Sequence, residues 1–176
     1  IMEKSRKLET VFDRINFVTA KLEIASRDIE LTHQKNIIKA LKGGKTVEVV
    51  QLERIQEVSQ KQLKLDRAFL QKINIGGEFL TDEQSANINM IANRYSISLD
   101  GVEQPLLSAD EISNLNIKRG TLNDEERFII QQHMTITQGI LEALPFPKHL
   151  SKVTEYALGH HERMDGTGYP QGLTKE

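Results

Sequence analysis

The chain has 176 residues, the size of one domain or of a domain with an appendage. Its 23 Lys and Arg residues against 25 Asp and Glu residues give a formal net charge of −2, which argues against a partner that is a nucleic acid polymer. The lack of cysteine excludes a disulfide scaffold, a thiolate zinc site and a cysteine nucleophile. No apolar run reaches the roughly 20 residues of a membrane span, so we expect a cytoplasmic chain. A membrane anchor elsewhere in the full-length protein stays open.

Two long helices are predicted in the first half of the chain. The first hundred residues contain no proline, which favours long helices. Apolar residues recur at helical spacing over residues 8–41 and again over residues 47–73. Gly43-Gly44 and Gly76-Gly77 come after these runs and end them. The pattern predicts an antiparallel helical hairpin over residues 8–75. Its exposed apolar positions indicate a homodimer formed through the hairpin.

Shorter helices are predicted over residues 81–115. Thr81–Gln84 and Ser108–Glu111 each fit the capping box, in which the first side chain caps the helix and the fourth reaches back. Between these two caps, residues 94–107 are the only segment in which a short strand is plausible. This part of the chain is therefore expected to be almost entirely helical.

A further helix is predicted from the cap Asn123–Glu126, where acidic residues face the positive end of the helix dipole. It should end near Leu144, because prolines occur at positions 145 and 147. A last helix is expected from about Lys148 toward Gly159. The resulting fold class is all-α, a long antiparallel hairpin plus a partial helical bundle. The expected inner side of the helix that begins at Asn123 consists of Ile129, Ile130, His133, Ile136, Ile140 and Leu141.

The sharpest local pattern runs from His160 to Pro170. Two adjacent imidazoles at a helix end, with an acid and a turn rich in Gly and Pro after them, are typical of a metal site. A hydrogen-bonded structural loop is the alternative that these residues leave open. His133 lies in the middle of a predicted helix on its apolar side, where a lone histidine is more often a core residue. It becomes a metal ligand only if the fold brings it beside His160 and His161.

The run His160-His161-Glu162-x-x-Asp165-Gly166-x-Gly168-Tyr169-Pro170-x-Gly172-Leu173 resembles the signature of the HD-GYP family. Upstream, Gly120-Thr121-Leu122, Glu125-Glu126, His133 and Gly139 also fall where that family has its characteristic residues, so the resemblance covers residues 116–176. It implies an all-helical, metal-dependent phosphohydrolase of bacterial signal transduction that opens cyclic di-GMP. Two or three divalent ions, iron or manganese, would activate the attacking water.

The resemblance also implies roles for individual residues. His133, His160 and His161 would be metal ligands, and Glu162 and Asp165 would be catalytic. Lys118, Arg119 and Arg163 would contact ligand phosphates, although solvent-exposed surface cations are an equally good interpretation. The turn would contact the ligand through Gly168, Tyr169 and Pro170. The same turn is a candidate docking site for a signalling protein.

One part of the family pattern is missing, because no histidine in the chain is directly before an aspartate. Lys4–Glu9 resembles the stretch that comes after the family's His-Asp pair, and Lys118–Leu122 resembles it again. We therefore expect that the His-Asp segment lay before residue 1, that residues 1–9 are the remnant directly after that segment, and that residues 10–115 are a helical insertion. Residues 116–176 would be the C-terminal part of the same domain. In the alternative, the domain is degenerate and Gln104-Pro105 or its neighbours replaced the pair.

These observations leave two classes of function open. In the first, the chain is part of a cyclic di-GMP phosphodiesterase whose parent domain is active, while this piece alone is inactive because metal ligands are missing. In the second, it is a non-catalytic module in which the hairpin mediates dimerisation or signalling. A plain helical adaptor would account for the hairpin but would leave the histidine motif unexplained.

Overall fold

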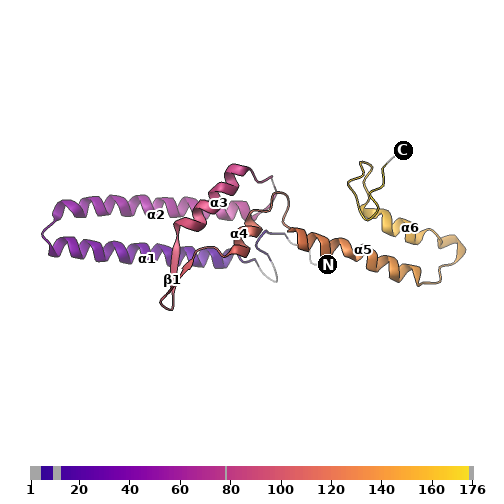
Figure 1. Cartoon of the computed structure of the whole chain (residues 1–176), viewed down its shortest axis with the longest axis horizontal. Helices are drawn as coiled ribbons and strands as arrows, with labels where there is room; N and C mark the ends of the chain where they lie inside the picture. The colour runs from indigo at the N-terminus through magenta and orange to yellow at the C-terminus, as the bar shows by residue number, and fades with distance from the viewer. Residues whose placement is uncertain (1–4, 10–12, 78, 175–176) are drawn as a thin grey trace. The chain divides into compact units, whose positions relative to one another are not determined.

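The structure is a computed structural model that describes residues 5–9, 13–77 and 79–174, and it is shown in Figure 1. The chain divides into two compact units, one ending at Leu122 and the other beginning at Asn123. Within the described residues, six α-helices and one two-stranded sheet are present. The predicted all-α class is therefore confirmed. None of the described helices is both long enough and apolar enough to cross a membrane.

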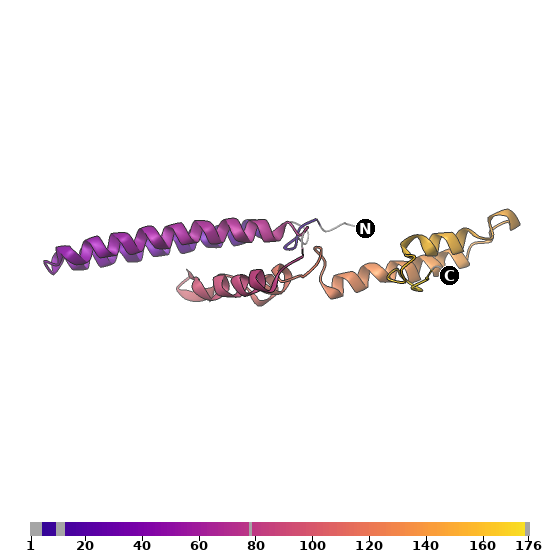
Figure 2. The ribbon, with the colours of Figure 1, turned by 90° about the horizontal axis from the view of Figure 1, so that it is seen from above.

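The first unit is built on the predicted helical hairpin. Helices α1 (Ile15–Lys42) and α2 (Thr46–Asn74) run antiparallel and pack side by side (Figure 1), and they overlie one another in Figure 2. The turn between them includes Gly44, whose φ of 71° is a left-handed conformation that glycine adopts without strain. The hairpin prediction is confirmed.

The first helix begins later than its apolar pattern indicated, at Ile15 and not at Leu8. Leu8 is fully buried, but in an irregular segment. Its backbone N–H donates to Oδ1 of Asn74 at 2.8 Å, and the N–H of Lys7 donates to the carbonyl oxygen of Asn74 at 3.0 Å. These bonds to the end of α2 replace the helical bonds that an earlier start would have made.

A second layer covers one half of the hairpin (Figure 2). It consists of helix α3 (Asp82–Arg94), strands β1 (Ser96–Leu99) and β2 (Val102–Pro105), and helix α4 (Ala109–Leu115). The strands pair antiparallel, with Ser96 opposite Pro105, in the only segment where a strand was expected. The predicted capping boxes at Thr81 and Ser108 are both present. The core of the unit lies between the two layers and includes Leu22, Leu70, Ile88, Ile97, Leu106 and Leu115.

The second unit carries the histidine motif. Helix α5 (Asp124–Glu142) begins at the predicted capping box of Asn123. The last predicted helix is interrupted: a 3₁₀ turn at Lys148–Leu150 precedes helix α6 (Val153–Leu158), and a second 3₁₀ turn at Gly159–His161 comes after it. Prolines at positions 145 and 147 precede this segment and separate it from α5, since proline cannot donate a backbone hydrogen bond within a helix.

The buried side of α5 differs from the expected one. Ile129, Ile136 and Ile140 were expected to face inward, but each is at least 60% exposed. Met134 is fully buried instead, and Ile130, His133 and Leu141 are half-buried. Helix α6 has only six residues, so it covers a narrow stripe of α5 and leaves the other apolar positions uncovered within the described structure.

Candidate metal centre

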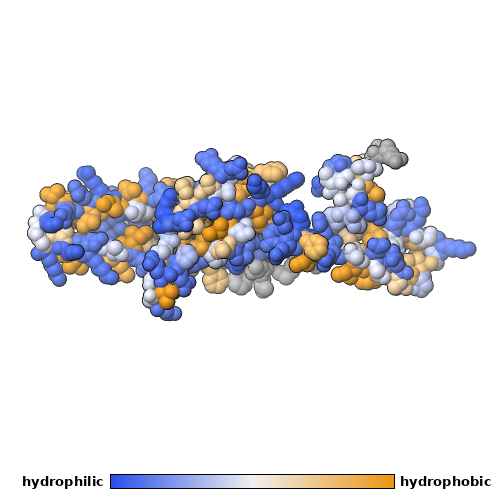
Figure 3. Space-filling model, viewed as in Figure 1, coloured by the Kyte–Doolittle hydropathy of each residue, from blue (hydrophilic) through white to orange (hydrophobic). Residues whose placement is uncertain are grey.

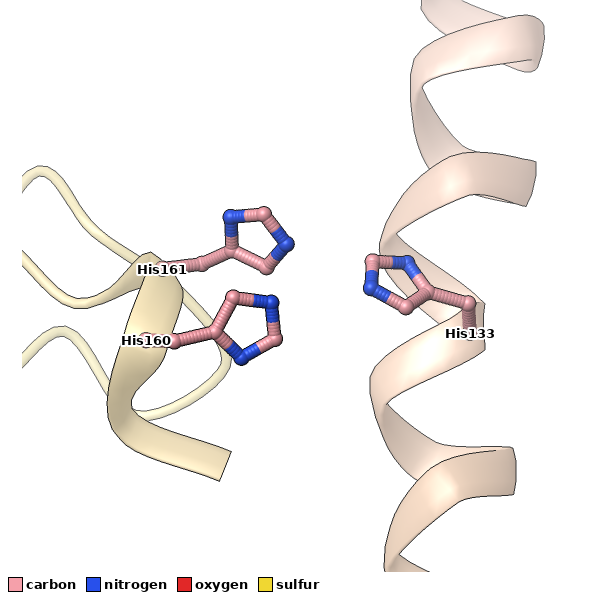
Figure 4. Close-up of side chains that lie close together, drawn as sticks. All are labelled: His133, His160 and His161. Atoms are coloured by element: carbon pink, nitrogen blue, oxygen red, sulfur yellow. The ribbon is translucent and has the colours of Figure 1, made fainter. Parts of the chain in front are cut away.

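Three histidine side chains converge in the second unit (Figure 4). His133 projects from the middle of α5, and His160 and His161 project toward it from the 3₁₀ turn after α6. The ring centroid of His133 lies 6.4 Å from that of His160 and 5.2 Å from that of His161, and the latter two are 3.9 Å apart. Each ring offers one nitrogen, and these nitrogens all lie within 4.8 Å of one another. The expected convergence of the three histidines is therefore present.

Backbone carbonyls fix two of the three rings. Nδ1 of His133 contacts the carbonyl oxygen of Ile130, and Nδ1 of His160 lies 2.5 Å from the carbonyl oxygen of Ala157. A ring that donates its Nδ1–H in this way keeps the lone pair on Nε2, which is the usual arrangement of a metal-ligating histidine. The pattern comes from helical geometry, because each carbonyl lies three residues before its histidine.

The electrostatics of the cluster favour a neutral His161. Its pKa is lowered, first by burial and then by the neighbouring His160 and His133 rings, which disfavour a further positive charge. Metal binding needs the neutral imidazole, since a protonated ring has no lone pair to give. The cluster therefore holds at least one of its rings in the form that a cation requires.

The donor set fits one divalent ion. Imidazole nitrogens bind such ions at about 2.0–2.2 Å, so two ligands on opposite sides of one ion are about 4.0–4.4 Å apart. The observed spread of 4.8 Å needs only a small inward movement of the rings. Imidazole ligands suit zinc, iron, copper and nickel. Among the described residues, this cluster contains no carboxylate.

The two carboxylates that the sequence singled out make structural contacts. Glu162 accepts hydrogen bonds from the backbone N–H groups of Gln171 and Leu173, at 2.6 and 2.8 Å. Asp165 accepts from the backbone and the hydroxyl of Thr167, at 2.9 and 2.6 Å, and these bonds lower its pKa. Both side chains therefore hold the loop after the histidine pair, while their catalytic roles stay predictions.

The loop brings Tyr169 onto the cluster. Its ring stacks on His161 with a centroid distance of 4.6 Å and an interplanar angle of 16°, and it meets His133 edge-on at 6.4 Å. Gly168 and Pro170 flank Tyr169, and the bond to Pro170 is cis. Arg163 is exposed near Asp165, whose pKa its charge helps to lower. The sequence indicated Tyr169 only as a ligand or packing residue, since no local pattern reveals its stacking partner.

The remaining predicted ligand contacts lie in the first unit. Nζ of Lys118 is 3.6 Å from a carboxylate oxygen of Asp82, and both side chains are highly exposed. The guanidinium of Arg119 lies over the ring of Phe79, 5.3 Å from its centroid. Neither contact tests a role in phosphate binding, which stays a prediction.

Comparison with known proteins shows what this part of the chain is similar to. Residues 106–176 match the family model described as HD domain. The chain is 36% identical over 96 residues to the 3'3'-cGAMP-specific phosphodiesterase 1 of Vibrio cholerae serotype O1. It is 49% identical over 57 residues to a cyclic di-GMP phosphodiesterase of Thermotoga maritima. Over 152 residues it is 28% identical to the 3'3'-cGAMP-specific phosphodiesterase 3 of the same Vibrio cholerae strain.

These alignments cover 54%, 32% and 76% of the chain, but the chain spans only 21%, 15% and 32% of the three relatives. No solved structure matches the chain. Residues 106–176 are therefore similar to HD domains, and the motif from His160 to Leu173 resembles the HD-GYP signature. HD domains of this kind are metal-dependent, which agrees with the histidine cluster.

Proposed function

We propose that this chain is part of a phosphodiesterase that opens a cyclic dinucleotide, cyclic di-GMP or a close relative of it. The observation that carries the proposal is the convergence of His133, His160 and His161 inside an HD-GYP motif. The relatives support the substrate class, because their names specify phosphodiesterases of 3'3'-cGAMP and of cyclic di-GMP.

In this proposal the three histidines hold a divalent ion, iron or manganese. When bound, such an ion would lower the pKa of a water molecule, so that hydroxide is available at neutral pH to attack a phosphodiester. The chain's own residues orient the ligands. Backbone carbonyls orient the rings of His133 and His160, and Tyr169 of the following loop stacks on the ring of His161. Arg163, Lys118 and Arg119 are proposed to neutralise ligand phosphates, and the turn Gly168-Tyr169-Pro170 to contact the bases.

The hairpin is proposed to be an insertion within the same domain, over residues 10–115. The alignment with phosphodiesterase 3 covers more of the chain than residues 106–176 contain, so part of the preceding segment also has a counterpart in that relative. The chain holds no His-Asp dipeptide. The proposed activity therefore needs metal ligands beyond the three histidines.

A turnover assay tests the proposed function. The 176-residue chain and the complete product of its gene are incubated with cyclic di-GMP or 3'3'-cGAMP and added Mn²⁺ or Fe²⁺. We expect hydrolysis by the complete protein and none by the 176-residue chain. Three imidazoles without a bridging carboxylate cannot hold two metal ions beside each other to activate the water. Robust turnover by the chain itself would contradict the need for further ligands. An inactive complete protein that carries an intact His-Asp pair would favour the non-catalytic module.

A second proposal concerns the uncovered half of the hairpin, residues 26–62. Within this segment Ala40 is the only buried residue, whereas seven large apolar side chains are exposed. Figure 3 shows apolar side chains among charged ones along this end. A groove of about 680 Å³ runs along the same half and is lined in part by Ile29, Leu52 and Ile55. The exposed apolar residues are Leu31, Ile38, Leu41, Val47, Val50, Ile55 and Val58.

We propose that a second copy of the hairpin covers this half and forms a four-helix bundle. The charges near the turn favour that partner: the end of α1 carries Lys35, Lys39 and Lys42, and the start of α2 carries Glu48, Glu53 and Glu57. A two-fold axis along the hairpin places α1 of one copy beside α2 of the other, so that the basic and acidic segments meet. A signalling protein docked at the Gly-Tyr-Pro turn is a separate proposal that rests on the family resemblance.

Charge substitutions on α2 test the dimer. Val47 and Val58 are 76% and 69% exposed and lie on one face, so Val47→Glu with Val58→Glu leaves the fold of one chain intact. We expect the double substitution to raise the dissociation constant of the dimer at least tenfold, which corresponds to a loss of about 1.4 kcal/mol in the free energy of association. Sedimentation equilibrium measures this, with Val102→Glu on the exposed strand β2 as a control. A chain that is monomeric at every concentration would overturn the proposal.

A further inference from the structure

His161 is held in a different way from the other two histidines. His133 and His160 each place Nδ1 against a backbone carbonyl. No hydrogen bond to the ring of His161 is observed among the residues that the structure describes. This ring lies instead against the rings of His160 and Tyr169, with centroids 3.9 and 4.6 Å away. Stacking is therefore the contact that sets its orientation.

Tyr169 reaches the ring of His161 on a loop that folds back onto its own start. The backbone N–H of Tyr169 donates to the carbonyl oxygen of His161 at 3.3 Å. At Gly168 the two strands of the loop touch: a Cβ there would overlap the backbone nitrogen of Arg163 and would lie 2.5 Å from Cα of Glu162. The position of the Tyr169 ring thus depends on this backbone contact.

The carboxylate of Glu162 fastens the far end of the loop. Oε1 accepts the N–H of Gln171 at 2.6 Å, and Oε2 accepts the N–H of Leu173 at 2.8 Å. The two donors come directly after Tyr169-Pro170, so the loop is pinned on the side opposite to Gly168. Bonds to an ionised carboxylate are stronger than neutral ones. A glutamine offers one acceptor in place of two, and its NH₂ group would face a second donor.

We propose that Tyr169 is a positioning residue for His161 and that Glu162 is a positioning residue for Tyr169. Glu162 then acts on the metal centre through the loop and the stacked ring, and not as a catalytic group. This inference rests on the proposed function, since it assumes that the histidines hold a divalent ion. In this inference Glu162 holds the loop closed, and Tyr169 orients the ring of His161.

The first test needs no metal. In NMR spectra of the 176-residue chain, protons of the His161 ring are shielded by the stacked face of Tyr169. Tyr169→Ala should move these signals downfield, whereas Tyr169→Phe, which keeps an aromatic face, should leave them in place. Glu162→Gln should also move them downfield. Tyr156→Ala and Glu155→Gln are matched controls, because both residues are exposed on α6.

The second test titrates the same variants with Fe²⁺, which imidazole ligands suit, in the 176-residue chain and in the complete protein. We expect Tyr169→Ala and Glu162→Gln each to raise the dissociation constant by about 10–100-fold, the usual effect of losing a group that orients a ligand. Tyr169→Phe should keep the original affinity. The double substitution should raise the dissociation constant no more than Tyr169→Ala alone does, because Glu162 is proposed to act only through Tyr169.

The outcomes separate this inference from the proposed function. If neither the 176-residue chain nor the complete protein binds Fe²⁺, the metal-site proposal fails, and the NMR spectra still decide whether Glu162 holds Tyr169 on His161. If Fe²⁺ is bound and the variants bind it equally well, the positioning roles are refuted while the metal site stands. A Tyr169→Phe variant as weak as Tyr169→Ala would assign the effect to the hydroxyl and overturn the stacking argument. Additive losses in the double variant would show that the two residues act independently.

Discussion

Replacing His133, His160 or His161 by alanine should abolish hydrolysis by the complete protein and remove most of its Mn²⁺ affinity. Each substitution takes one of three nitrogen donors from a cluster that contains no carboxylate among the described residues. Losing a direct ligand should cost far more than the roughly 10–100-fold effect of losing a group that merely orients one. The measurements are turnover of cyclic di-GMP and titration with Mn²⁺, performed on the same protein samples.

A matched control is available in the same unit. His149 lies exposed in the 3₁₀ turn before α6 and is not a member of the cluster. His149→Ala should leave both activity and Mn²⁺ affinity unchanged. Activity that survives in any of the three cluster variants would remove that histidine from the metal site. Full activity in all three would overturn the proposed centre.

Replacing Asp66 by alanine should strongly destabilise the first unit. The carboxylate of Asp66 is buried and accepts bonds from Arg94 at 2.5 Å, from the Tyr95 hydroxyl at 2.8 Å and from Gln62 at 2.8 Å. Removing it leaves three donors without their acceptor. We expect a loss of about 2–4 kcal/mol in the free energy of unfolding, somewhat less than the roughly 3–5 kcal/mol for a fully buried pair, because Arg94 is about one-third exposed. Chemical denaturation measures this, and Glu30→Ala on the exposed side of α1 should change little.

The same contact makes the stability depend on pH in the alkaline range. Burial, and then the bond to Asp66, raise the pKa of Tyr95 from 10.0 to about 12. Because the folded pKa is the higher one, the folded state keeps its proton between these values, and stability present below pH 10 is lost as pH rises toward 12. Absorbance titration should show one of the three tyrosines ionising late, and Tyr95→Phe should remove that step. Three tyrosines that ionise together would contradict it.

The parts of the fold that depend on nearby residues could be predicted from the sequence. All three capping boxes form where Thr81, Ser108 and Asn123 indicated them, because each links residues only three apart. The hairpin and the short strands also result from local patterns. The start of α1 could not be predicted, since it depends on bonds to Asn74, which is more than 60 residues away.

The candidate site shows the same division. The histidine pair and the turn after it are visible in the sequence, but His133 joins them only through the resemblance to a family, because 27 residues separate it from His160. The resemblance to that family implied a catalytic role for the carboxylate of Glu162. Its bonds to the N–H groups of Gln171 and Leu173 depend on how the loop closes, which no spacing rule expresses.

The backbone contact at Gly168 has a consequence for which substitutions the motif tolerates. A side chain at this position would overlap the main chain of Glu162 and Arg163, so even alanine is excluded. Gln171 and Leu173 contribute only their N–H groups to Glu162, so any residue except proline satisfies the same bonds. In a saturation library of residues 160–173 screened for folded protein, we therefore expect many substitutions to be tolerated at positions 171 and 173 and almost none at position 168. The identity of some residues in the motif is therefore fixed by close contacts between backbone atoms, and not only by a role in metal binding or catalysis.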